Sequence, residues 1–226
     1  MQPRYLILDT ETWGLGTPEP PASGVVEIAW LEVDPDTLDV VSEFSSRVNP
    51  GCKIQPGASA IHGLSDEDVA DAPTLGEVFN PDSDIVVGGH NSLFDLKFVA
   101  PYTSRITDTF CTLALARQYV RSSPNHKLQT LADHFGLAKG KAHAALGDVY
   151  TTLELLKVLV DLSGRPLPTL VQAARKPKLT PVMPYGRHKG VQMHKVPVPY
   201  MEWLLAQDGV DQDLRYSMAQ QLKVRA

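Results

Sequence analysis

The stretch YLILDTETWGLG, from Tyr5 to Gly16, decides the fold that this sequence predicts. Its first four residues are a short apolar run of the kind that forms a strand buried on both faces. The run ends in Asp9, Thr10 and Glu11, and side chains two positions apart on a strand point to the same side. Two carboxylates on one face repel each other unless a cation lies between them. The pair therefore indicates either solvated acids at a polar strand end or one part of a metal site.

Length and composition are typical of a globular protein. The 226 residues suit one α/β domain with a small appendage, or two small domains. No run reaches the ~18 apolar residues that a membrane helix needs, and no secretory signal is visible. Cys52 and Cys111 are the only cysteines and form no close pair, which argues against a cysteine-based zinc site. We therefore expect reduced thiols, a cytoplasmic location and no membrane partner.

Charge is distributed unevenly along the chain. The net charge is −5, but residues 1–164 hold 11 Lys and Arg against 22 Asp and Glu, a net of −11. Residues 165–226 hold 10 against 4, a net of +6. An acidic body with a basic tail is compatible with nucleic-acid binding by the tail, and equally with a solvated basic surface.

The segments after the first strand extend a sheet. Residues 25–33 and 38–48 read as two strands, and Asp34-Pro35-Asp36 between them predicts an antiparallel hairpin. Glu27 in the first of these strands faces either the acid pair or the solvent, with a supporting role at most. Residues 49–64 are rich in Pro and Gly and read as a loop, followed by short helices over 65–69 and 74–79.

A second acidic position follows the next buried strand, residues 85–89. The sequence HNSLFD after it places Asp95 in the first turns of a helix that leaves the end of a strand. In open α/β sheets that end is where ligands bind. Residues 105–107 read as a further strand, and Asp108 as the N-cap of a helix over 109–119.

A third acidic position lies in the long helical pattern from residue 143 to residue 162, which follows a short helix over 127–135 closed by Gly136. His143 and Asp148 are five positions apart, about 140° around an ideal helix. They would diverge if both lay in the helix interior. To face one site, His143 must precede the first turn while Asp148 lies inside the helix.

These motifs together resemble a known family. The DxE of residues 9–11, the NxxFD of residues 91–95 and the HxxxxD of residues 143–148 resemble, in order and spacing, the histidine branch of the DEDD exonuclease superfamily. The resemblance covers about residues 4–162. Within the superfamily the loop IHGLSDEDV and the C-terminal tail are similar to those of bacterial exonuclease X-type enzymes. The resemblance implies an α/β fold, a ribonuclease H-like mixed sheet of five strands flanked by helices.

The resemblance also implies a mechanism. Four carboxylates in one pocket cannot all stay ionised unaided, so two divalent ions are expected, Mg²⁺ by preference with Mn²⁺ as a substitute. Such ions activate water and stabilise the leaving 3′ oxygen. The family assigns the general base to the histidine, a residue type that titrates near neutral pH. The implied catalytic residues are His143 and the four acids, and the implied metal ligands are Asp9, Glu11, Asp95 and Asp148.

Secondary roles at the substrate have alternatives. The family uses groups after the first acid pair to hold the terminal 3′-OH, which points to Thr10 and Thr12. Leu15 either wedges against the last base or packs on the core. His62 either contacts substrate or caps local backbone. Asn91 is expected to brace the loop that carries Asp95.

The tail predicts a separate small module. We interpret residues 1–163 as the nuclease domain, 164–180 as a linker, and 181–226 as a basic α+β module. Residues 183–190 read as a strand and turn, 191–196 as a second strand, and helices begin at Pro199 and Asp211. Tyr185 with the basic run at 187–189 is suited to gripping a phosphate backbone. A mini-core is expected from Tyr200, Trp203 and Leu204.

Three functions compete. The leading prediction is a metal-dependent 3′–5′ exonuclease acting on DNA, single-stranded or at duplex 3′ ends, and releasing nucleoside 5′-monophosphates. One alternative is the same chemistry on RNA, because discrimination of the 2′-OH depends on loop contacts. The other is a non-catalytic nucleic-acid-binding or partner-docking module on the same fold. The sequence carries no prediction of oligomeric state.

Overall fold

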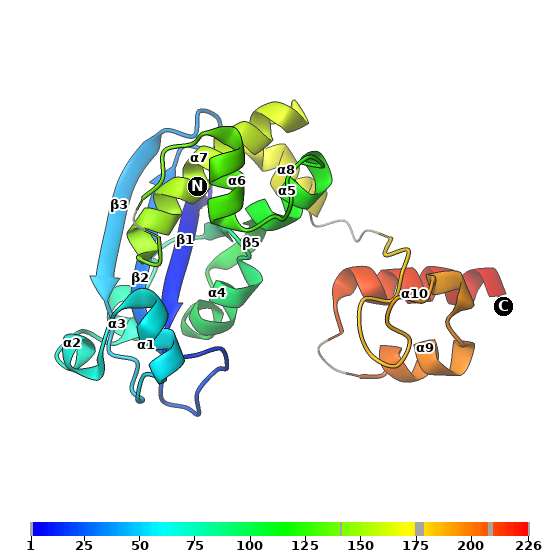
Figure 1. Cartoon of the computed structure of the whole chain (residues 1–226), viewed down its shortest axis with the longest axis horizontal. Coiled ribbons are helices and arrows are strands. Elements are labelled where there is room, and N and C mark those ends of the chain that lie inside the picture. Colours follow the sequence, from blue (N-terminus) through cyan, green and yellow to red (C-terminus); the bar gives the residue numbers. More distant parts are fainter. Residues whose placement is uncertain (1, 141, 175–178, 208–209, 226) are drawn as a thin grey trace. The chain divides into compact units, whose positions relative to one another are not determined.

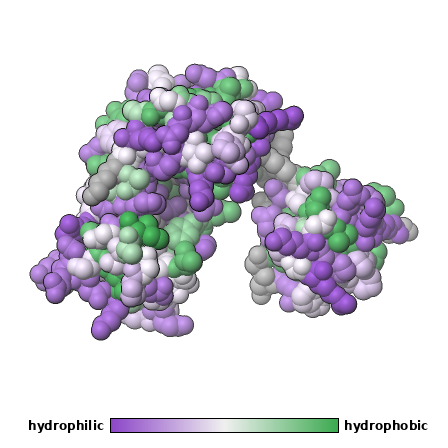
Figure 2. Space-filling model, viewed as in Figure 1, coloured by the Kyte–Doolittle hydropathy of each residue, from purple (hydrophilic) through white to green (hydrophobic). Residues whose placement is uncertain are grey.

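The chain divides into two compact units. The computed structural model describes residues 2–140, 142–174, 179–207 and 210–225, and Figure 1 traces them. The first unit is Met1–Val171 and the second is Gln172–Ala226. Figure 2 shows that the visible face of each unit is mostly hydrophilic, with smaller hydrophobic patches. No helix within the described residues is both long and apolar enough to span a membrane.

The first unit is built on one mixed sheet of five strands in the order β3-β2-β1-β4-β5. Strand β1 pairs antiparallel with β2 and parallel with β4; β2 and β3 are antiparallel, and β4 and β5 are parallel. The predicted five-stranded mixed sheet flanked by helices is confirmed. The strands are β1 Arg4–Thr12, β2 Val25–Val33, β3 Val40–Arg47, β4 Ile85–Gly89 and β5 Ile106–Cys111.

Alternation along β1 separates two hydrophobic cores. Tyr5 and Ile7 pack in one core with residues of four helices, whereas Leu6 and Leu8 pack on the opposite face with residues of two others. The sheet is therefore the middle of three layers, and both faces of its central strand β1 are buried in a hydrophobic core. The first core holds residues of α5 Thr112–Tyr119, α6 Leu128–Phe135, α7 Ala145–Ser163 and α8 Leu167–Ala174; the second holds residues of α3 Leu75–Val78 and α4 Leu93–Val99.

Three short helices gather near one end of the sheet in Figure 1. The predicted helices after residues 65 and 74 are confirmed as α2 Asp66–Val69 and α3, each opened by a capping box. The loop predicted over 49–64 is wrong in part, because α1 occupies Pro56–His62. Pro at the first helical position and Gly63 at φ 79° after the last one suit a helix start and stop.

Pairing with β4 overrides a predicted cap. Asp108 is not a helix N-cap: β5 continues through it to Cys111, and Asp108 pairs with Val86. Helix α5 consequently begins at Thr112 rather than at residue 109. The neighbouring strand offers a ladder of hydrogen bonds that local capping cannot match.

The linker interpretation of residues 164–180 is wrong for α8. Three apolar side chains of this helix, Leu167, Leu170 and Val171, are buried in the first core. The helix therefore belongs to the packed body of the first unit as far as Val171. Residues 175–178 of the predicted linker lie outside the described residues.

The second unit is a small helical module. Helices α9 Val198–Leu205 and α10 Gln212–Arg225 confirm the predicted pair of helices. The two strands expected within 183–190 and over 191–196 are wrong, so the α+β expectation for this module is wrong as well: among the described residues of this unit only Val182 and Gln192 form an isolated bridge. A 3-10 helix, η2, follows at Met193–Lys195. Trp203 does not join the mini-core, since 56% of it is exposed. The buried core consists of Met183, Met193, Val196, Met201, Leu204, Leu214 and Met218.

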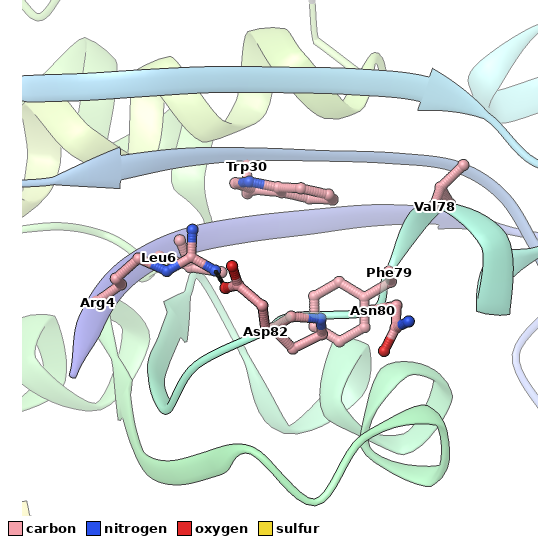
Figure 3. A pocket seen from close by; sticks show the side chains of 8 residues that line it. Arg4, Leu6, Trp30, Val78, Phe79, Asn80 and Asp82 are labelled. Carbon is pink, nitrogen blue, oxygen red and sulfur yellow. Dashed lines mark hydrogen bonds and ion pairs between the residues drawn. The ribbon is translucent and has the colours of Figure 1, made fainter. Parts of the chain in front are cut away.

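A cavity of about 300 Å³ lies beside the first residues of β1. Figure 3 shows the guanidinium of Arg4 paired with the carboxylate of Asp82, with Trp30 and Phe79 among the lining side chains. Arg4 forms ion pairs with Asp82, which lines the cavity, and with Glu32, which does not. The cavity lies toward the opposite end of β1 from Asp9 and Glu11.

Candidate active site

The four predicted acids come from three elements that meet at one end of β1. Asp9 and Glu11 lie within the last four residues of β1, which continues to Thr12 because residues 9–11 still pair with β2. Asp95 is in the first turn of α4, just after β4, and Asp148 is in the first turn of α7. Parallel pairing of β1 with β4 places the carboxyl ends of these strands at the same edge.

Asp95 is tied directly to the strand that carries the other acids. The backbone N–H of Thr10 donates to Asp95 Oδ1 over 3.0 Å, and the Thr10 hydroxyl donates to the same oxygen over 2.8 Å. Asp95 is only 4% exposed. Burial raises its pKa to about 7, while the two bonds from Thr10 and the charge of Lys97 act in the opposite direction.

Asp9 and Glu11 are perturbed mainly by burial and then by their acidic neighbours. Burial and the charges of Asp95, Glu11, Asp148 and Glu27 raise the pKa of Asp9 well above its usual value. Burial, followed by Asp148, Glu27 and Asp95, raises the pKa of Glu11 to about 7. The neighbouring acids therefore raise the pKa values of both Asp9 and Glu11, which shows that the negative charges of the cluster lie close together.

His143 lies where the helical geometry requires it. Helix α7 begins at Ala145, so His143 precedes the first turn and Asp148 lies inside it, as expected. The His143 backbone is left-handed (φ 58°), and its N–H donates to Asp148 Oδ2 over 3.0 Å. Ligand atoms of Glu11, His143 and Asp148 all lie within 4.8 Å of one another. Burial raises the pKa of Asp148. The hydrogen bond from the His143 backbone, the charge of His143 and the hydrogen bond from Gln129 lower it in part.

Two further side chains, Gln129 and Glu27, support the acids, and the sequence alone predicted no role for the first. Gln129 Nε2, on α6, donates to Asp148 Oδ1 over 3.0 Å. Glu27 Oε2 accepts from the backbone N–H of Ala145 over 2.8 Å and so holds the first residue of α7. Of the two orientations left open for Glu27, the structure shows the one toward the acid cluster, because its charge acts on Asp9 and Glu11. No spacing rule signals Gln129, because its partner lies on another helix.

The segment that leads to His143 crosses α7 at very close range. A Cβ atom on Gly140 would lie 2.3 Å from Gly147 Cα and 2.4 Å from its carbonyl oxygen. The Gly140 N–H donates to Thr151 Oγ1 over 3.1 Å. Glycine at position 140 therefore lets the segment before His143 approach the backbone of the helix.

The loop before Asp95 is held chiefly by the neighbours of Asn91. Asn91 has a left-handed backbone (φ 68°), and its carbonyl accepts from the Phe94 N–H over 2.8 Å at the start of α4. The Ser92 hydroxyl donates to the Phe110 carbonyl over 2.9 Å, and His90 Nδ1 lies 3.0 Å from the Thr112 hydroxyl oxygen. The bracing expected of the Asn91 side chain stays a prediction.

The predicted substrate-binding residues differ in exposure and in the hydrogen bonds that they already make. The Thr12 hydroxyl donates to the Gly14 carbonyl, and the Thr10 hydroxyl is engaged by Asp95, so their contact with a 3′-OH stays a prediction. Leu15 is 84% exposed, which contradicts the alternative that it packs on the core. His62 Nδ1 accepts from the Leu64 N–H, as a local backbone cap does. Its Nε2 is buried and makes no hydrogen bond of full geometry among the described residues, although the Thr12 backbone is close enough to act on its pKa. Burial lowers the pKa of His62.

The donor set suits divalent cations. Asp9, Glu11, Asp95 and Asp148 offer carboxylate oxygens, the hard ligands that Mg²⁺ and Mn²⁺ prefer. Within the part of the chain that the structure describes, none of the four forms an ion pair with Lys or Arg. Burial and mutual repulsion already hinder ionisation of these acids. A bound cation would relieve both effects, so the residues present fit a metal.

Comparisons with known proteins agree with this geometry. A family model described as an exonuclease matches residues 6–156, and one described as a quorum-sensing-regulated virulence factor matches residues 176–225. Exodeoxyribonuclease 10 of Escherichia coli K12 is 29% identical over 236 residues, 96% of this chain and 98% of that protein. The solved structure of exonuclease X in complex with 5′ overhanging duplex DNA has a TM-score of 0.61 and 28% identity, covering 74% of this chain and 98% of the other.

Other relatives are longer. A bifunctional exonuclease/endonuclease protein of Mycobacterium tuberculosis is 29% identical over 220 residues, 85% of this chain but 34% of that protein. The chain therefore spans about a third of the length of this relative. The exonuclease model runs from β1, with its acid pair, into α7, beyond Asp148, and covers well over half of the 226 residues. With its ribonuclease H-like sheet and its clustered acids, this chain belongs to the exonuclease family.

Proposed function

We propose that this chain is a 3′–5′ exonuclease that hydrolyses the terminal phosphodiester bond at DNA 3′ ends and releases nucleoside 5′-monophosphates. The observation that carries the proposal is the meeting of four buried or half-buried acids from β1, α4 and α7, with His143 beside two of them. The similarity to exodeoxyribonuclease 10 and to a nuclease solved with duplex DNA supports DNA as the substrate.

The proposed cofactor is a pair of Mg²⁺ ions, with Mn²⁺ as a substitute. The exonuclease family depends on divalent metal, and Glu11, His143 and Asp148 form a group able to hold an ion. We assign Asp9, Glu11, Asp95 and Asp148 as ligands because their oxygens are hard donors. Such ions, when bound, supply the positive charge that stabilises the phosphodiester transition state and lower the pKa of the attacking water.

The residues of the chain supply positioning and proton transfer. Thr10 holds Asp95 through two bonds, and Gln129 with the His143 backbone holds both oxygens of Asp148. The carboxylates are thereby oriented before substrate arrives, which is where much of the catalytic advantage of such sites originates. The imidazole of His143, on an exposed segment beside Glu11 and Asp148, accepts the proton of the attacking water.

Leu15 is the proposed contact to the terminal base. It projects from the turn after β1 and is 84% exposed, so an apolar side chain is available to stack on a base of any identity. Thr12, His62 and Asn91 are proposed to contact the terminal nucleotide.

The proposed location is the cytoplasm. Cys52 and Cys111 are free thiols, as is usual in a reducing compartment, and the proposed substrate is DNA.

Degradation of end-labelled nucleic acids tests the proposal. The 226-residue chain is incubated with single-stranded DNA, duplex DNA and RNA, each labelled at the 5′ end to follow shortening or uniformly to detect mononucleotides, with Mg²⁺, with Mn²⁺ or with EDTA. The expected result is stepwise shortening of DNA from its 3′ end with release of mononucleotides, only with metal. Asp9→Ala should abolish it, and His143→Ala should lower the rate about 100- to 10,000-fold, the usual contribution of a general base.

Matched control variants distinguish a loss of catalysis from a general effect of substitution on the folded protein. Asp39→Ala removes an exposed acid of the β2–β3 connection, and His194→Ala removes an exposed histidine of the second unit. Both should degrade DNA as the wild type does. Preference for RNA would replace the substrate assignment, and unchanged activity of Asp9→Ala would refute the site. Binding of DNA with no hydrolysis under any metal would favour a non-catalytic module.

A further inference from the structure

Two exposed aromatic side chains of the second unit have no role in its core. Tyr185 is 42% exposed and Trp203 is 56% exposed, whereas the buried core is built from methionine, leucine and valine. Large aromatic side chains bury much apolar area when they pack, so leaving a tryptophan mostly in water forgoes stabilisation. An exposed aromatic group is a signature of a binding surface when it is clustered with others.

Such a cluster exists on this unit. The Tyr200 ring makes an edge contact with the His188 ring at 4.6 Å and lies 5.6 Å from the Trp203 ring. The turn carrying His188 lies directly against Tyr200, since a Cβ atom on Gly186 would approach the Tyr200 hydroxyl to 2.5 Å. The turn of residues 184–190 and the face of α9 with Tyr200 and Trp203 therefore form one continuous surface, here called the aromatic face.

The second unit is basic as a whole, and the turn of the aromatic face contributes two of its cations, next to one exposed acid on α9, Glu202. The second unit holds nine Lys and Arg against four Asp and Glu, a net of +5, while residues 1–171 carry −10. Arg215 and Arg225 are used internally, because both donate to backbone carbonyls of the unit. Arg187 and Lys189 in the turn are exposed, and among the described residues neither has an ion-pair partner.

We infer that the aromatic face binds a single strand of DNA, with bases stacked on Trp203 and Tyr185 and phosphates contacted by Arg187 and Lys189. Aromatic platforms beside cations are the usual means of binding single strands without sequence preference. The choice of DNA rests on the proposed function of the first unit. A second binding unit on the same chain raises the local concentration of substrate at the nuclease without any new contact at its active site.

Binding measured without hydrolysis tests this inference. The full chain is mixed with a long 5′-labelled oligothymidylate in EDTA, and fluorescence anisotropy gives the dissociation constant over a series of salt concentrations. Trp203→Ala should weaken binding about 5- to 160-fold, the range for loss of one base stack. Arg187→Ala combined with Lys189→Ala should reduce the slope of log K against log salt by about 1.4, the value for two phosphate contacts on a single strand.

The second unit supplies its own controls. Tyr216→Ala removes an aromatic side chain of α10 that is 36% exposed, and Lys223→Ala removes an exposed cation near the end of the same helix. Both should bind as the wild type does. Circular dichroism of each variant establishes that the unit still folds, and Trp203→Phe, which keeps a ring for stacking, should recover most of the lost affinity.

Two outcomes would overturn the inference. The first is wild-type affinity and an unaltered salt slope in Trp203→Ala and in the double variant. The second is tighter binding of oligouridylate than of oligothymidylate, which would assign the face to RNA. Neither depends on catalysis: failure of the proposed function would instead appear as absence of mononucleotide release with metal while oligonucleotide binding persists.

Discussion

At the scale of single residues, the site consists of charged groups and of the neutral groups that orient them. Asp148 illustrates both, because one of its oxygens accepts from Gln129 and the other from the His143 backbone. A carboxylate held at both oxygens has little rotational freedom left. Such outer contacts set the direction of the lone pairs offered to a metal.

Replacing Gln129 tests this role. Gln129→Ala leaves one oxygen of Asp148 without its donor, so we expect metal affinity or nuclease activity to fall about 10- to 100-fold. The measurement is DNA degradation as a function of Mg²⁺ concentration, with Gln192→Ala, an exposed glutamine of the second unit, as the control. An Mg²⁺ profile identical to that of the wild type would show that Asp148 does not need the contact.

At the scale of elements, the position of His143 depends on how its segment crosses α7. The crossing is possible because Gly140 has no side chain where Gly147 approaches. A methyl group there meets backbone atoms, which cannot rotate away as the end of a flexible side chain can. The site therefore depends on a residue with no chemistry of its own.

Gly140→Ala should displace the segment that carries His143. We expect a loss of stability of about 1–3 kcal/mol from overpacking and a fall in kcat of about 100-fold from misplacement of the base. Urea denaturation and single-turnover degradation measure the two effects. Gly57→Ala is the matched control, since nothing lies within 4 Å of its added Cβ and alanine is favoured in a helix. Equal kcat in both variants would argue against the crossing as the positioning device.

Helix α8 makes a second prediction at this scale. Leu170 is 4% exposed in the first core, although its segment reads as a linker. Leu170→Ala should lower the free energy of unfolding of the first unit by about 2–5 kcal/mol, as large-to-small core substitutions do. Leu162→Ala, at a position 52% exposed, should change it by no more than about 0.5 kcal/mol. Thermal unfolding compares them, and similar Tm values would mean that α8 adds nothing to the body.

At the scale of the whole molecule, the acid cluster couples stability to pH and metal. Folding raises the pKa of Glu11 and of Asp95 to about 7, so the metal-free folded state binds more protons than the unfolded chain between about pH 4 and pH 7. The stability that these groups contribute is therefore present at low pH and is lost as the pH rises through 7. For Glu11 the effect is at most about 3 kcal/mol.

Thermal unfolding with EDTA and with Mg²⁺ measures this coupling. Between about pH 5 and about pH 8 the metal-free wild type should lose more Tm than Glu11→Gln, which cannot titrate at that position. Mg²⁺ should raise the Tm of the wild type more at the higher pH, where protons no longer compete for the carboxylates. A metal effect independent of pH, or equal in Glu11→Gln, would contradict the proposed ligand set.

Local pattern in the sequence was sufficient for much of the framework. Apolar runs and turn residues predict β1, the β2–β3 hairpin and β4, because burial and backbone preference act over a few neighbours. The local pattern starts the helix at residue 143, and only the condition that His143 and Asp148 share one site required His143 to precede it, because a helix rotates each residue by a fixed angle; α7 begins at Ala145. The ordered motifs then identified the acids that the structure brings together.

Only the tertiary structure decided the features that depend on distant partners. Asp108 lies in a strand because β4 pairs with it, and α8 is part of the body because the first core accepts its apolar side chains. Glu27 contacts Ala145 across 118 positions of sequence, and Trp203 stays in water because the second unit fills its core without it. These outcomes are set by pairing and packing energies between segments far apart in the chain, which no local pattern contains.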